Sequence, residues 1–139
     1  MQSKRHNPFW SIGLAWGPAC AWAAAIFWMS SRLETPTPTF WLPPHADKII
    51  HAVLYAILAG LIHVALRMRG FPPPRAAWWA LGLASLYGIT DEWHQSMVAN
   101  RHADVMDWIA DTVGAAWVVF AARHETRWFP GFLHRKFSP

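Results

Sequence analysis

The sequence predicts an all-α integral membrane protein, a four-helix bundle that forms a single domain. Hydrophobic residues make up 54% of its 139 residues and charged residues only 14%, against about 25% charged in ordinary soluble domains. The apolar residues are gathered into blocks of about 20, the length that crosses about 30 Å of hydrocarbon as a helix. The mean hydropathy of +0.13 is low for such a protein, because eleven Trp, eleven Pro and twelve Lys and Arg residues lower the average.

Four blocks are predicted to cross the membrane. The first has no charged residue, and its length and its ending in F-W-M-S-S favour a retained helix over a cleaved signal peptide. The second follows a Pro-Pro pair, and Asp47 suits the positive end of its helix dipole. The third crosses only if Asp91 and Glu92 lie at the interface or face protein. The predicted spans are about 9–31, 47–66, 75–95 and 104–122, followed by a short basic tail, 123–139.

The distribution of Lys and Arg predicts how the chain is oriented. Nine of the twelve lie before the first span, between the second and third, or after the fourth, and the other three are Arg32, Lys48 and Arg101. Because cytoplasmic loops carry the excess of basic residues, both termini are predicted to be cytoplasmic. We therefore expect a multi-pass protein of the bacterial inner (plasma) membrane, with membrane lipids as partners. The net charge of +4 does not predict nucleic-acid binding, because the basic residues flank apolar blocks.

Polar residues from three spans should meet at the outer face of the membrane, where the second and fourth spans begin and the third ends. Their spacing places them on one stripe of each helix. They are Asp47, His51 and Tyr55 on the second span, Glu92 and Gln95 on the third, and Asp104, Asp107, Asp111 and Gly114 on the fourth. The stripes predict a polar funnel that opens outward and has its floor near Tyr55 and Asp111.

With Asp91, the funnel would hold six carboxylates and few bases, and buried carboxylates cannot all stay ionised without partners. Either some are protonated, or a cation, amine or hydroxyl-rich ligand is bound, or several lie in water. Plainer interpretations are that Asp104 only caps the fourth helix and that Tyr55 only holds helices together. His51 with Asp47 and nearby carboxylates would suit a divalent ion. No closed ligand motif of the zinc type is present, so no metal site is predicted.

Three segments of the chain resemble the VanZ-like family of small polytopic bacterial membrane proteins. They read D-K-I-I-H-A-V-L-Y at 47–55, L-Y-G-I-T-D-E-W-H-Q at 86–95 and N-R-H-A-D-V-M-D-W-I-A-D-T-V-G at 100–114. The family patterns are D-K-x-x-H-x-x-x-Y, D-E-x-x-Q and R-x-x-x-x-x-D-x-x-x-N-x-x-G, so Asp111 stands where the pattern has Asn. The resemblance implies one VanZ-like membrane domain over 1–139. It also implies a link, through the founding member, to resistance against glycopeptide antibiotics such as teicoplanin.

The first functional hypothesis is that the funnel binds a cell-envelope component such as a lipid-linked or glycan headgroup. An extension of this hypothesis is that the protein also modifies the component. His51 and Asp107 are the catalytic candidates. The ligand-binding candidates are Asp47, Tyr55, Asp91, Glu92, Gln95, Arg101, Asp104 and Asp111.

The alternative is a non-enzymatic accessory subunit of a larger membrane complex that packs through Trp22, Trp28, Trp78 and Trp79. A proton or cation pathway has less support, because no polar residues continue the funnel into the cytoplasmic half. The sequence leaves open whether the protein binds a cofactor and whether it is an enzyme.

Overall fold

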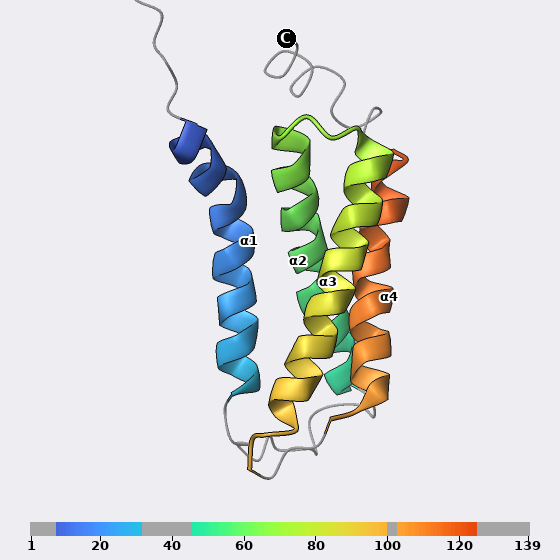
Figure 1. Ribbon diagram of the computed structural model, residues 1–139. Helices are drawn as coiled ribbons and strands as arrows, with labels where there is room; N and C mark the ends of the chain where they lie inside the picture. The colour runs from blue at the N-terminus through green and yellow to red at the C-terminus, as the bar shows by residue number, and fades with distance from the viewer. Residues whose placement is uncertain (1–7, 32–45, 100–102, 125–139) are drawn as a thin grey trace, which may run out of the picture.

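The computed structural model describes residues 8–31, 46–99 and 103–124 and contains four α-helices in that part of the chain (Figure 1). They are α1 (Pro8–Ser30), α2 (Ala46–Met68), α3 (Pro73–Gln95) and α4 (Val105–Ala122). Successive helices run in opposite directions, so α1 ends, α2 begins, α3 ends and α4 begins at the same end of the bundle. The predicted all-α four-helix fold is confirmed. Each helix begins and ends within two residues of its predicted span.

The turn between α2 and α3 shows why these two helices stop and start where they do. Gly70 has a φ of 86°, a left-handed conformation that costs glycine nothing because it has no Cβ. The Phe71 N–H donates to the Leu66 carbonyl at 3.1 Å and the Gly70 N–H to the Arg67 carbonyl at 3.0 Å, the two bonds of a Schellman cap. Helix α3 then begins at Pro73, because proline fits the first helical turn.

Small residues line much of the interior of the bundle, beside larger ones such as Tyr55 and Leu58, and many large apolar residues lie on its exterior. Ala76, Ala80, Ala84 and Gly88 recur every four residues along α3 and are all buried. Such small residues let membrane helices approach closely. The large apolar residues on the outside include Leu14, Trp78, Trp93, Val105, Val113 and Trp117. Because an apolar exterior of this extent is rare on soluble monomers, the distribution is typical of a protein surrounded by lipid.

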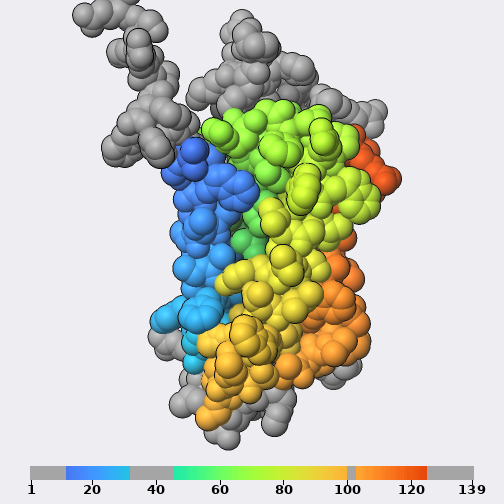
Figure 2. Space-filling model, in the orientation of Figure 1, coloured from blue at the N-terminus to red at the C-terminus, as the bar shows by residue number. Residues whose placement is uncertain are grey.

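Three of the described helices are long and apolar enough to cross a membrane: α1 over Ile12–Ser30, α2 over Ala46–Met68 and α4 over Val105–Ala122. Helix α3 is not among them, although its 23 residues equal α1 and α2 in length. It carries Arg75 in its first turn and Asp91 and Glu92 in its last turns. The membrane crossing of α3 stays a prediction. Figure 2 shows α3 covering much of α2 in this view, with α1 and α4 on either side.

Helix α1 is held to α2 and α3 by hydrogen bonds, two of which join a side chain to the backbone. The Trp22 indole N–H donates to the Leu54 carbonyl of α2 at 3.0 Å. The Tyr87 hydroxyl of α3 donates to the Ala23 carbonyl at 2.7 Å. Trp22 therefore packs α1 against α2, whereas Trp28, farther along α1, is exposed.

Candidate functional site

Lys48, in the first turn of α2, links three carboxylates from two helices. Its ammonium nitrogen donates to Asp104 Oδ2 and to Asp107 Oδ1, each at 2.6 Å, and lies 3.2 Å from Asp47 Oδ2. An ammonium group has three N–H donors, so this arrangement can occupy all of them. The sequence-based candidates did not include Lys48. Its position between Asp47 and His51 in D-K-I-I-H was the available signal.

Asp104 joins the beginning of α4 to the end of α3. It is the N-cap of α4, where its Oδ1 accepts the Met106 N–H at 2.8 Å, as the capping interpretation predicted. Its own backbone N–H donates to Glu92 Oε2 at 2.7 Å. The hydrogen bond from the Lys48 ammonium holds the pKa of the Asp104 carboxyl below its ordinary value, because a nearby positive charge favours the ionised form.

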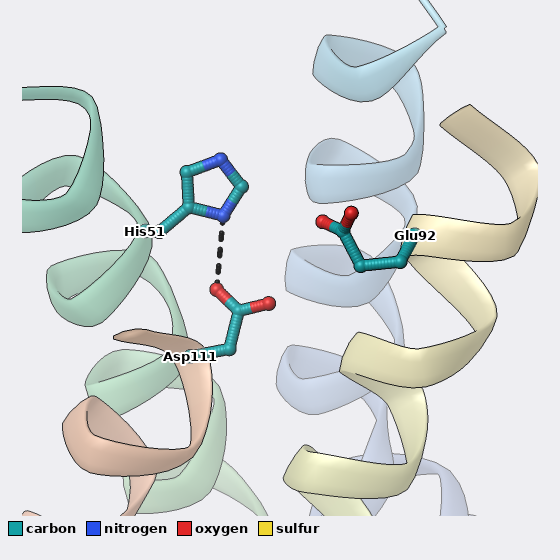
Figure 3. A group of neighbouring side chains, drawn as sticks. All are labelled: His51, Glu92 and Asp111. Carbon is teal, nitrogen blue, oxygen red and sulfur yellow. Dashed lines mark hydrogen bonds and ion pairs between the residues drawn. The ribbon is translucent and has the colours of Figure 1, made fainter. Parts of the chain in front are cut away.

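Deeper in the bundle, His51 of α2, Glu92 of α3 and Asp111 of α4 point toward one another (Figure 3). We call these three residues the inner triad. His51 Nδ1 and Asp111 Oδ1 are hydrogen-bonded at 2.9 Å, and His51 Nε2 lies 3.9 Å from Asp107 Oδ1. One ring nitrogen of His51 and one oxygen from each carboxylate all lie within 4.8 Å of one another.

The deepest polar atoms lack hydrogen-bond partners among the described residues. These atoms are Glu92 Oε1, Asp111 Oδ2 and the Tyr55 hydroxyl, and Tyr55 and Asp111 are both 0% exposed. A Cβ at Gly88 would lie 3.1 Å from Asp111 Oδ2 and 3.4 Å from Tyr55 Cε1. Glycine at position 88 therefore leaves space beside the free oxygen of Asp111 that a side chain would fill.

Together these residues form what we call the polar column. Its members are Asp47, Lys48, His51, Glu92, Asp104, Asp107 and Asp111. The exposed fraction of the side chain falls from 61% at Asp47 through 24% at Lys48 and 15% at Asp107 to 0% at Asp111. The polar stripes predicted on α2 and α4 do converge with Glu92 of α3, and Tyr55 and Asp111 lie at the buried end. Whether these residues bind a ligand or act in catalysis stays a prediction.

Asp91 and Gln95 lie in a different contact, between α3 and α1. Ser30 donates its hydroxyl to Asp91 Oδ1 at 2.6 Å, and the Gln95 amide donates to Asp91 Oδ2 at 3.0 Å. All three side chains are buried. The sequence grouped Asp91 and Gln95 with Glu92, but each pairs away from the column. Ser30 was not among the candidates, and only its place at the end of the first apolar block pointed to it.

The last sequence-based candidate, Arg101, lies outside the described residues. In the part of the chain that the structure describes, the column therefore sets five carboxylates against Lys48 and His51. With all five carboxylates ionised and both basic groups protonated, its formal charge would be negative. This excess of acceptors suits a partner that brings positive charge or hydroxyl and amine donors.

Fold and site define an α-helical membrane protein with a polar column that begins at one end of its bundle. The model of the VanZ/LLP1 family matches residues 4–127. The chain belongs to this family, which accords with the three segments that resemble VanZ-like proteins. Comparison with the curated proteins and with the solved structures gives no match.

Proposed function

We propose that this VanZ-like membrane protein binds a cell-envelope component through its polar column. The component would be a lipid-linked or glycan headgroup that carries hydroxyl and amine groups. The supporting observation is the graded exposure of one connected set of polar side chains, from the rim at Asp47 to the buried Asp111. By the distribution of Lys and Arg, the rim would face the outside of the inner membrane, where such headgroups are presented.

The contacts in the column suggest a role for each of its residues in binding. Asp104 and Asp107 would release Lys48 in part and accept hydroxyl or amine hydrogens of the headgroup, as charge-assisted hydrogen bonds. Asp111, bonded to His51 Nδ1 at 2.9 Å, would orient the imidazole. His51 Nε2 would then face Asp107 and the entering ligand, in the position of a general acid or base if the component is modified.

The test is binding of an amino-sugar glycolipid to the purified full chain in mild detergent, measured by native mass spectrometry. The same glycolipid with the amine acetylated is the matched ligand. We expect the free amine to bind more tightly, and Asp107→Asn to weaken it at least about tenfold, because a hydrogen bond to a charged group is worth about 1.5–3 kcal/mol.

The matched variants for the histidine are His51→Ala and His63→Ala, which remove the same side chain from opposite ends of α2. Only His51→Ala should weaken binding. If the protein modifies the ligand, which would change the mass of the ligand, only His51→Ala should stop that change. Unchanged binding in both Asp107→Asn and His51→Ala, at normal expression and helix content, would contradict the proposal.

An accessory subunit is the second candidate, and one surface feature favours it. Pro74, Arg75, Trp78 and Trp79 line an open hollow at the beginning of α3, opposite the column, and both tryptophans are exposed. Exposed tryptophans also suit the membrane interface. Native mass spectrometry of the purified chain therefore distinguishes the two candidate functions. A stoichiometric partner that Trp78→Ala releases would support the accessory function. A lone chain that binds the glycolipid would support the first candidate.

A further inference from the structure

The inner triad has features that headgroup binding at the rim does not require. We propose that His51, Glu92 and Asp111 bind a divalent metal ion of the Zn²⁺ or Mn²⁺ kind between α2, α3 and α4. The proposal uses the buried end of the same column but does not rest on headgroup binding, because a metal ion can be measured with no envelope component present.

The three side chains come from three helices and already face one another (Figure 3). Their candidate ligand atoms lie within 4.8 Å of one another. Bonds of about 2.0–2.2 Å would bring ligand atoms somewhat closer than that limit. Rotation of the Glu92 and Asp111 side chains about their own bonds would supply this closure.

Each carboxylate is held by one oxygen and leaves the other without a partner. Glu92 Oε2 accepts the Asp104 N–H, whereas Glu92 Oε1 is buried and unpartnered among the described residues. Asp111 Oδ1 is bonded to His51, whereas Asp111 Oδ2 is likewise buried and unpartnered. A buried polar atom without a partner costs about 1–3 kcal/mol, and more when charged, so two in one small space point to a bound ligand.

The ligand between Glu92 and Asp111 must bring positive charge, and a small cation brings it in the least space. Glu92 and Asp111 are 7% and 0% exposed, and ionised carboxylates at such depth need paired charge. Lys48 is already occupied by Asp104 and Asp107 nearer the rim. A divalent cation would neutralise both carboxylates, and glycine at position 88 keeps a Cβ from pressing on Asp111 Oδ2.

The donor set narrows the kind of metal. One imidazole nitrogen and two carboxylate oxygens are intermediate between the nitrogen and sulfur ligands of structural zinc sites and the all-oxygen shells of Mg²⁺ and Ca²⁺. Zn²⁺ and Mn²⁺ accept such mixed sets. Three protein ligands would leave at least one coordination position open, as in catalytic zinc sites. The Tyr55 hydroxyl, buried near Asp111, or an entering ligand could occupy that position.

The experiment uses the full chain, purified in detergent without a polyhistidine tag, stripped with chelator and titrated with Zn²⁺, Mn²⁺ or Mg²⁺ alone by calorimetry. The expected result is about one tightly bound Zn²⁺ or Mn²⁺ per chain and much weaker Mg²⁺ binding. Elemental analysis of protein purified without chelator provides an independent count. The chain has eight histidines, which can bind Zn²⁺ weakly. The comparison among variants therefore shows whether the bound ion lies at the inner triad.

Three variants each remove one ligand: His51→Ala, Glu92→Gln and Asp111→Asn. Each should weaken metal binding by at least about a hundredfold, since changes in residues that only support the ligands cost 10–100-fold. His63→Ala is the matched control on the same helix and should leave the affinity unchanged. The two isosteric amide variants remain informative if His51→Ala fails to fold, which circular dichroism will show.

Two results would overturn the proposal. One is a wild-type chain that binds neither Zn²⁺ nor Mn²⁺ more tightly than Mg²⁺. The other is an equal effect of the triad variants and His63→Ala, which would mean that the ions bind at surface histidines. A chain that binds metal but no glycolipid would refute the headgroup proposal alone, and the reverse result would refute the metal proposal alone.

Discussion

Two aspartates of this protein are both buried, but among the described residues only one of them has a hydrogen-bond partner on each oxygen. Asp91 is 3% exposed and Asp111 is 0% exposed. Both oxygens of Asp91 accept hydrogen bonds, from Ser30 of α1 and from Gln95 one turn away on α3. Asp111 has His51 on one oxygen and no partner among the described residues on the other.

The difference shows that burial alone does not mark a functional carboxylate. A fully partnered acid such as Asp91 stabilises a helix contact and gains nothing from a ligand. An acid with one unpartnered oxygen, such as Asp111, lowers the stability of the fold until a ligand binds that oxygen. Such unpartnered buried groups are typical of functional sites. The contact between α1 and α3 is therefore expected to be structural, and the column between α2, α3 and α4 to be functional. Three substitutions test this division, from the largest expected effect to the smallest.

Asp91→Ala should lower the free energy of unfolding by about 2–4 kcal/mol, because it leaves the Gln95 amide as a buried donor without its acceptor. It also removes the charge-assisted hydrogen bond from the Ser30 hydroxyl, which keeps the Phe27 carbonyl as its other acceptor. Unfolding in mixed micelles by dodecyl sulfate, followed by circular dichroism, measures this change. Ser30→Ala removes only one of the two bonds and should cost about 1 kcal/mol. If the Asp91→Ala protein is as stable as the wild type, the contact between α1 and α3 is not the structural one that we expect.

Gly88→Ala should cost about 1–3 kcal/mol, since the new methyl group would press on Asp111 Oδ2 at 3.1 Å and on Trp108 Cδ1 at 3.3 Å. Gly82→Ala, on the same helix, is the control. A Cβ there meets nothing within 4 Å, and alanine favours helix over glycine by up to about 1 kcal/mol. The same unfolding assay should therefore show opposite signs for the two variants. Equal signs would mean that the space beside Asp111 is not closely packed.

Asp111→Asn should change stability by less than about 1 kcal/mol, because the amide oxygen can keep the bond with His51 while a buried charge disappears. The same change should abolish tight metal binding. A large loss of stability with unchanged metal binding would reverse the assignment and make Asp111 the structural aspartate.

Local patterns in the chain were enough to predict much of this protein. Apolar blocks, the prolines before α2 and α3 and the acid at position 104 located all four helices within two residues. Helical periodicity placed His51 and Asp111 on inward stripes, because residues three, four and seven apart share one face whatever the surroundings. The three motifs led to the family that the family model then showed. None of these inferences required a contact between helices.

Only the tertiary structure decided which polar groups pair. Glu92 and Gln95 share a stripe on α3, yet Glu92 binds the N–H of Asp104 and Gln95 binds Asp91. Lys48 joins α2 to α4 through Asp104 and Asp107, and Asp91 of α3 pairs with Ser30 of α1. The physical reason is that periodicity sets the face of a helix but neither its rotation against its neighbours nor its axial register. Both depend on how small residues such as Gly88 and Gly114 let the backbones approach, Gly114 so closely that a Cβ would overlap Ala52 of α2.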